Sequence, residues 1–126
     1  MKDNSRDLFR LKHIVECAIK IEKIAQELET ADAFLLKWIE QDAMLRNFEI
    51  IGEAANHLSY AVKEKYSNVE WYKVRGMRNL MAHKYFEIEL KIVWKTAIED
   101  IPPLKSQIEK IIKSIEEEES NTPDNY

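Results

Sequence analysis

Residues 8–28 read Leu-Phe-Arg-Leu-Lys-His-Ile-Val-Glu-Cys-Ala-Ile-Lys-Ile-Glu-Lys-Ile-Ala-Gln-Glu-Leu, and their apolar side chains recur every three or four positions. That spacing is typical of one face of an amphipathic helix. The stripe consists of Leu8, Leu11, Val15, Ala18, Ile21, Ala25 and Leu28. Because Ile14, Ile19 and Ile24 widen it, we expect a long helix, capped by Ser5, that packs on more than one side. His13 lies beside the stripe and is expected to be a partly exposed helix histidine.

The same spacing continues along the chain. A second long helix is predicted after a restart at Thr30 or Asp32, with an apolar stripe of Phe34, Trp38, Leu45, Phe48, Ile51, Ala55, Leu58 and Val62. Ser67 and Glu70 form the pattern of a capping box, which predicts a third helix from about Asn68 to His83. Its buried stripe would be Trp71, Val74, Met77 and Met81.

The last third of the chain predicts two more helices. One starts near Ile88 and carries Leu90, Val93, Ala97 and Ile101. Pro102 and Pro103 should break it, because proline lacks the N–H and clashes with the preceding turn. Asp100 would then cap a fifth helix with Leu104, Ile108, Ile111 and Ile115. We therefore predict an all-α fold, an antiparallel bundle of four to five helices.

Length and composition limit the remaining possibilities. A chain of 126 residues fits one domain, which we place at 1–117, with an acidic disordered tail at 118–126. No apolar run approaches the roughly 20 residues that span a bilayer, and no secretion signal is evident at the start. Cys17 is the sole cysteine, so an internal disulfide is impossible and a cytoplasmic location is expected. We expect neither a metal site nor a phosphate-cradling glycine loop.

Net charge argues against strong nonspecific binding of nucleic acid. The chain carries −4, and residues 116–126 alone carry −5, which leaves +1 on residues 1–115. A nearly neutral body cannot make the many phosphate contacts that nonspecific binding requires. A small site that touches few phosphates remains compatible with this balance.

A polar stripe lies opposite the apolar stripe of the second predicted helix and consists of Asp42, Arg46, Glu49, Glu53 and Asn56. It is either a solvated face with ion pairs or the lining of a cleft that orients the functional side chains. Gly52 should cost roughly 1 kcal/mol relative to Ala in mid-helix. We therefore expect a close backbone approach there, from the third helix or from a second subunit. His57 is interpreted as structural.

The segment between Trp71 and Phe86 contains no acid and holds the cations Lys73, Arg75, Arg78 and Lys84. Arg offers a planar fork that suits phosphate, and His moves a proton near neutral pH. On an α-helix, Asn79 would share a face with His83, whereas Arg78 lies about 140° away. Convergence of Arg78 and His83 then needs the long arginine side chain, a helix that ends near His83, or a second chain.

Arg78-Asn79-x-x-x-His83 resembles the Arg-x(4–6)-His signature of the HEPN superfamily, and with Tyr85 it resembles the narrower Arg-x(4)-His-x-Tyr motif of HepT-like toxins. Leu45 to Ala55, Tyr85-Phe86 and Val93-Trp94 resemble the flanks of that motif, and the resemblance covers roughly residues 5–115. Lys84 stands where the family has a small residue, often Gly.

The resemblance implies a HEPN-like bundle and a metal-independent endoribonuclease without a cofactor. Arg78 and His83 would be catalytic, supported by Asn79, Arg75, Lys84, Glu53 and Arg46. It also implies a homodimer whose two motifs face one cleft that receives RNA. The partner would be an MntA-like nucleotidyltransferase antitoxin that uses ATP to add AMP to Tyr85.

Other interpretations of the same residues remain open at this stage. Arg78 could pair with Glu49 or Glu53, Asn79 could serve a helix end, and His83 could cap a helix C-terminus. Tyr85 could be an amphipathic interface residue. The chain would then be a non-catalytic helical partner, or a nucleotide-binding module, of a nucleotidyltransferase.

Overall fold

A computed structural model of the protein describes residues 3–83 and 86–121, and almost all of them lie in helices. The elements are α1 (Asp3–Leu28), α2 (Ala31–Leu35), α3 (Trp38–Asn56), α4 (Tyr60–Lys65), α5 (Trp71–Gly76), the 3₁₀ helix η1 (Met77–His83), α6 (Glu87–Glu99) and α7 (Ile101–Asn121). No strand occurs in these two ranges. The predicted all-α class is therefore confirmed.

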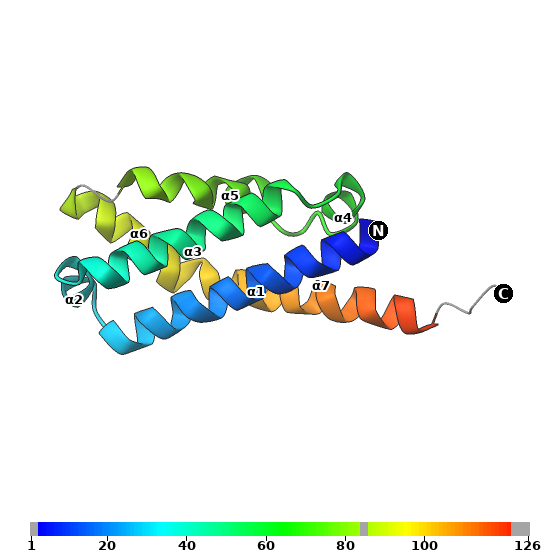
Figure 1. The fold of residues 1–126 in the computed structure, drawn as a ribbon, viewed down its shortest axis with the longest axis horizontal. Helices are drawn as coiled ribbons and strands as arrows, with labels where there is room; N and C mark the ends of the chain where they lie inside the picture. The colour runs from blue at the N-terminus through cyan, green and yellow to red at the C-terminus, as the bar shows by residue number, and fades with distance from the viewer. Residues whose placement is uncertain (1–2, 84–85, 122–126) are drawn as a thin grey trace.

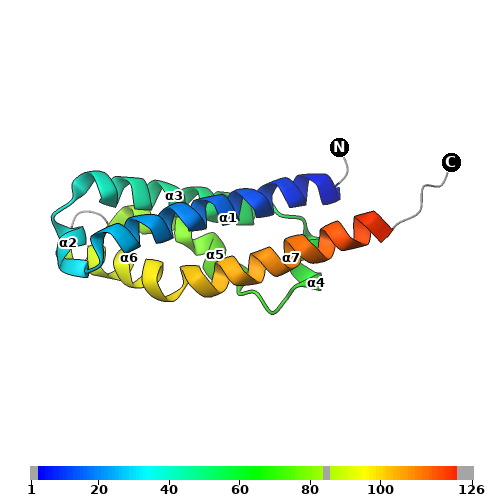
Figure 2. The ribbon, with the colours of Figure 1, turned by 90° about the horizontal axis from the view of Figure 1, so that it is seen from below.

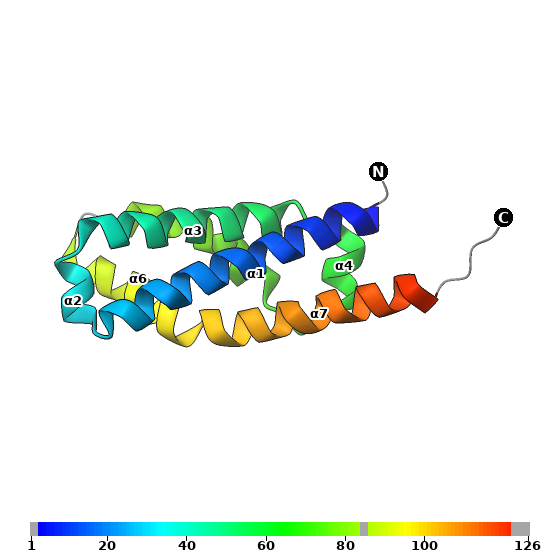
Figure 3. The ribbon, with the colours of Figure 1, turned by 60° about the horizontal axis from the view of Figure 1, so that its bottom comes forward.

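The long helices form an antiparallel bundle (Figure 1). α1 packs against α3 on one side and against α7 on the other, which explains the width of its apolar surface (Figure 3). α5 and η1 run back along α3, and α6 and α7 then return in nearly one line beneath α1 (Figure 2). α1 begins and α7 ends at the same end of the bundle.

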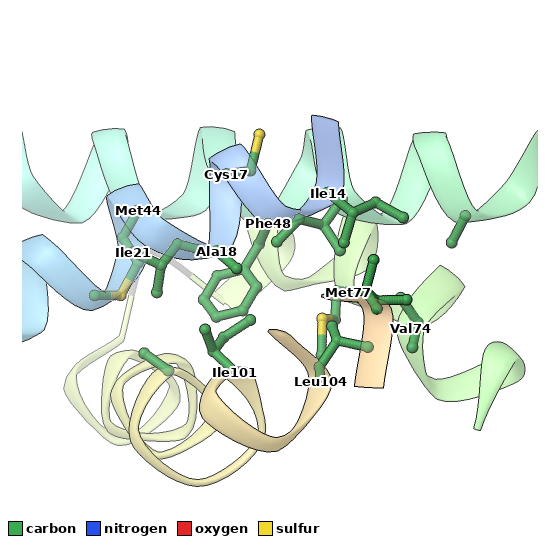
Figure 4. Packing of buried hydrophobic residues seen from close by; sticks show 14 of the residues in the cluster. Ile14, Cys17, Ala18, Ile21, Met44, Phe48, Val74, Met77, Ile101 and Leu104 are labelled. Carbon is green, nitrogen blue, oxygen red and sulfur yellow. The ribbon is translucent and has the colours of Figure 1, made fainter. Parts of the chain in front are cut away.

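One continuous apolar core joins these helices (Figure 4). Ile14 from α1, Phe48 from α3, Met77 from η1 and Leu104 from α7 all turn into it. Each such side chain contributes about 1.5–3 kcal/mol on full burial. Cys17 is also buried, and burial raises the pKa of its thiol, so the side chain is an unreactive part of the core.

Several predicted helix starts are wrong. α1 already includes Asp3, so Ser5 lies inside it and is no cap. The second predicted helix is three helices. Thr30 accepts a hydrogen bond from Ala33 N at the start of α2, where a restart was expected, and the helix is then interrupted at Leu36 and Lys37 without a side-chain cap bond. Ser59 accepts a hydrogen bond from Val62 N and caps the start of α4, where periodicity alone showed one continuous stripe.

Trp38 was expected in the core and is 69% exposed. It is the first residue of α3, and the chain leaves α2 at Leu36 before it re-enters a helix. The interruption resets the helical phase, so the spacing from Phe34 no longer predicts which side faces inward. Phe34 itself is fully buried and its ring lies 5.3 Å from that of Trp94.

The predicted break at the two prolines is confirmed. α6 ends at Glu99, and α7 begins at Ile101, so both prolines lie in the first turn, where their missing N–H groups cost no hydrogen bond. The side chain of Asp100 lies 3.5 Å from Lys73 Nζ. α7 continues to Asn121, so residues 118–121 of the expected tail are helical, and residues 122–126 lie outside the described ranges.

Gly52 is where α3 and the segment that holds Arg78 come closest. A Cβ on Gly52 would lie 2.5 Å from Arg78 N, 2.7 Å from Arg78 Cβ and 2.8 Å from Arg75 O. The expected close approach is therefore confirmed, and the element that approaches belongs to the same chain. Two of those three atoms are backbone, which cannot rotate away from an added methyl group.

We predict that Gly52→Ala lowers the free energy of unfolding by about 1–3 kcal/mol, the usual cost of an overpacked contact. Urea unfolding followed by circular dichroism measures it. The matched control is Gly76→Ala, because a Cβ there would meet no atom within 4 Å. That variant should be neutral or gain up to about 1 kcal/mol from helix propensity. Equal stability of the two variants would contradict the assignment of Gly52 as a contact point.

Candidate active site

The segment that carries Arg78 and His83 is not the single α-helix that the sequence predicts. α5 begins at Trp71 with Glu70 at its N-cap and no side-chain cap bond, so the predicted capping box at Ser67 is wrong. After Gly76, the residue with the weakest helix propensity in this stretch, the chain tightens into η1. Its seven residues exceed the usual length of a 3₁₀ helix.

The 3₁₀ geometry changes which side chains share a face. With three residues per turn, Asn79 and His83 lie about 120° apart instead of sharing a face. Arg78 and His83 also lie about 120° apart, and no hydrogen bond or ion pair joins them. The structure therefore places Arg78 and His83 on one 3₁₀ helix, each with a partner on a different helix.

Arg78 is held by α3. Its Nη1 lies 2.9 Å from Glu53 Oε1, and the other carboxylate oxygen of Glu53 lies 3.6 Å from His57 Nε2. Of the two expected partners for Arg78, the structure selects Glu53, while Glu49 pairs with Arg46. With 34% of its side chain exposed, Arg78 keeps donors that face solvent and can meet a phosphate.

His83 ends η1 with an unusual environment. Its Nδ1 is buried and has no hydrogen-bond partner among the described residues. Glu89 Oε1, from the first turn of α6, lies 3.9 Å from Nδ1. A contraction of about 1 Å would turn this pair into an ordinary hydrogen bond, and such bonds are often long before substrate binds. Glu89 is therefore placed to orient the ring.

The sequence missed Glu89, because it lies six residues beyond His83 and across a link between two helices. No periodic pattern connects the two positions. The one available signal was the pair of acids in the first turn of α6, Glu87 and Glu89, which are also common at helix starts for electrostatic reasons.

The expected supporting residues lie in different places. Asn79 is exposed, and the Arg75 guanidinium stacks over Tyr72, 5.2 Å from the ring centroid. Arg46 is exposed on α3 and pairs with Glu49. Lys84 and Tyr85 lie outside the described residues.

Three residues of the predicted polar stripe, Arg46, Glu49 and Glu53, line a depression and also form ion pairs. Both interpretations of the stripe are therefore met in part, because Glu53 holds Arg78 although neither Arg78 nor His83 lines the depression. The depression lies between α1 and α3 and has a volume of about 450 Å³. Its lining consists of Phe9, Arg10, His13, Arg46, Glu49, Ile50, Glu53, Ala54 and His57. His13 is partly exposed, as expected. A smaller depression of about 160 Å³ lies between α5 and α7 and contains neither Arg78 nor His83.

Residues 3–83 and 86–121 lack two further features. No group of three or more His, Cys, Asp or Glu side chains there is arranged to hold a metal ion. None of the helices in this part of the chain has the length and apolar character needed to cross a membrane.

Comparison with known families gives a match over residues 14–111 to the model described as "Ribonuclease HepT-like". The chain belongs to this family. The predicted family resemblance is thereby confirmed, and the matched range contains α3, η1 and α6, which together carry Arg78, Glu53, His83 and Glu89.

Curated relatives of this HepT-like chain carry ribonuclease names. "Probable ribonuclease HepT" of Thermococcus cleftensis is 35% identical over 113 residues, which cover 90% of this chain and 100% of that protein. "Putative RNase TTE0752" of Caldanaerobacter subterraneus subsp. tengcongensis is 36% identical over 104 residues, 82% of this chain and 91% of that protein.

A third relative is larger. The chain matches "Gamma-glutamylcyclotransferase and putative RNase MJ0434" of Methanocaldococcus jannaschii with 36% identity over 111 residues. The match covers 88% of this chain and spans only half, 50%, of that protein. Comparison with solved structures gave no significant match.

Proposed function

We propose that this HepT-like ribonuclease is a metal-independent endoribonuclease in which Arg78 and His83 act on the RNA phosphodiester. One observation carries the proposal. In a chain of a ribonuclease family, the 3₁₀ helix η1 holds a partly exposed arginine, Arg78, and a histidine, His83, that lies beside Glu89. Both side chains are about one-third exposed, so a substrate can reach them while α3 and α6 restrict their motion.

In the proposed reaction, the ribose 2′-OH attacks the adjacent phosphorus. A base removes the 2′-OH proton, the O2′–P bond forms, and the P–O5′ bond breaks. An acid then gives a proton to the leaving 5′-oxygen, which yields a 2′,3′-cyclic phosphate and a 5′-hydroxyl end. Arg78 would stabilise the charge on the phosphate oxygens, and His83 would carry one of the two protons.

The second proton carrier would come from a second copy of the chain. Arg78 and His83 lie about 120° apart on η1, where Arg78 pairs with Glu53 and His83 lies beside Glu89, so one chain presents the two groups separately. A two-fold dimer would place two histidines and two arginines around one cleft. We therefore propose a homodimeric active site.

We further propose that the protein is the toxin of a toxin–antitoxin pair in the cytoplasm. Its partner would be a nucleotidyltransferase antitoxin, MntA-like, that transfers AMP from ATP to Tyr85. An added phosphodiester two residues from His83 would compete with RNA for Arg78 and Lys84. The alternative, a non-catalytic helical partner or nucleotide-binding module of a nucleotidyltransferase, is favoured by the Arg78–Glu53 pair, which also suits a purely structural role.

We predict that His83→Ala and Arg78→Ala each reduce RNA cleavage by roughly 10²–10⁴-fold, the usual effect of losing one acid–base or charge-stabilising group. Cleavage of labelled RNA by purified protein in EDTA is the assay, and circular dichroism checks folding. Lys105→Ala is a control, because that cation pairs with Glu22 away from η1. Full activity of both site variants would refute the catalytic assignment.

The dimer makes a separate prediction. If both copies supply a histidine to one cleft, wild-type chains mixed with excess His83→Ala chains should lose more activity than dilution explains. Light scattering on each sample gives the oligomeric state. A monomer that is fully active at the assay concentration would rule out the shared cleft.

Tyr85→Phe should keep ribonuclease activity and escape inhibition by the nucleotidyltransferase with ATP. A phenol with a reference pKa near 10 is a poor base at neutral pH, so its loss should spare catalysis. Intact-mass spectrometry and the cleavage assay, with and without partner and ATP, test this. If the Phe variant still gains AMP mass and is inhibited like wild type, Tyr85 is not the modified residue. If the wild-type protein gains no AMP mass, the nucleotidyltransferase inhibits it by docking alone. That result would favour the alternative of a non-catalytic helical partner.

A further inference from the structure

The depression between α1 and α3 is adjacent to Arg78 but plays no part in the chemistry described above. Glu53 belongs to both places, because it lines the depression and bonds Arg78 at 2.9 Å. A ligand in the depression would therefore lie one side chain away from the proposed phosphate site. We propose that this depression binds a nucleobase of single-stranded RNA, next to the phosphate that Arg78 contacts. The inference rests on the proposed ribonuclease function.

An exposed aromatic pair forms the edge of the depression. Phe9 is 70% exposed although it lies on a helix with a large buried surface. Its ring centroid lies 6.2 Å from that of His13, one turn further along α1, with 49° between the planes. Aromatic and imidazole rings at the surface of RNA-binding proteins stack against unpaired bases, and each stacked base contributes about 1–3 kcal/mol.

The charged groups in the depression suit a base better than a phosphate. Arg46 pairs with Glu49, and Glu53 is shared between Arg78 and His57. Arg10 is the remaining cation, and its Nη1 donates to the backbone carbonyl of His57 at 2.9 Å. With two arginines and two glutamates, the lining carries almost no net charge and gives a phosphate little attraction.

Base edges, in contrast, offer both donors and acceptors. A carboxylate such as that of Glu49 can accept from an exocyclic amino group, and the free N–H groups of Arg10 or Arg46 can donate to a ring nitrogen or carbonyl. The volume of about 450 Å³ can receive one base and its sugar. An unpaired base exposes its Watson–Crick edge and its faces, whereas a base inside an A-form duplex is paired and stacked, so the substrate class is single-stranded RNA.

The test measures binding and not cleavage. In a His83→Ala background, fluorescence anisotropy follows a short labelled oligoribonucleotide and an abasic strand of the same length. Phe9→Ala should weaken binding of the base-containing strand roughly 5- to 100-fold, the equivalent of one stacked base. Binding of the abasic strand should already be weak and should not change. The matched control is Trp38→Ala, because Trp38 is 69% exposed and is the first residue of α3, which starts at the end of the bundle away from the start of α1 (Figure 1).

Three results would overturn the inference. Phe9→Ala could bind the base-containing strand like its parent, or the abasic strand could bind as tightly as the normal one. Phe9→Ala could also turn a dimer into a monomer by light scattering, which would make the depression an interface between copies. The proposed function fails separately: a chain with His83 intact that binds this RNA through Phe9 but never cleaves it would refute ribonuclease activity and leave the base site standing.

Discussion

The contact between Gly52 and the backbone of Arg78 is the constraint on which the candidate site depends. An α-helix normally keeps neighbouring backbones 8–10 Å apart between axes, because side chains fill the space. A missing Cβ on α3 allows η1 to lie against it, so that Arg78 N and Arg75 O come within 2.8 Å of where a methyl group would be. From there the arginine side chain reaches back along α3 to Glu53. Glycine thus fixes the backbone, and the ion pair fixes the guanidinium.

His83, the other residue of the candidate site, lies against a different helix, α6. η1 extends roughly 2 Å per residue, more than an α-helix, so its five-residue interval separates Arg78 from His83 by about 10 Å along the axis. His83 then meets α6 and Glu89 rather than α3. A buried, unpaired ring nitrogen is costly in a folded protein and usually has a functional explanation. At the end of η1, Nδ1 has no hydrogen-bond partner among the described residues, and its carboxylate neighbour gives it the polar environment that the proposed proton transfer would use.

Helix α1 supports the positions of Arg78 and His83 indirectly, through its contacts with other parts of the bundle. α1 carries Asp7, which is 1% exposed and accepts hydrogen bonds from the backbone N–H and the hydroxyl of Ser59. These two hydrogen bonds hold the start of α4 in place and therefore also hold the turn that returns the chain toward η1. α1 also presents Phe9 and Arg10 beside the polar face of α3. One helix therefore contributes to the core, to the connection that aims η1, and to the depression proposed to bind a base.

The sequence by itself determined the all-α class, most of the core, the break at Pro102 and the close approach at Gly52, because each depends on local spacing or on one residue's covalent geometry. It also showed that Arg78 and His83 lie in a segment without acids. For Arg78 it offered two possible carboxylate partners, Glu49 and Glu53. Only the tertiary structure decided that Glu53 is that partner, that the segment is a 3₁₀ helix, and that Glu89 faces His83. Those features depend on which helices pack together, and no periodicity within one helix encodes its distance from another. The same reason explains Trp38, since the interruption at Leu36 and Lys37 resets the helical phase between α2 and α3 and the apolar stripe loses its register.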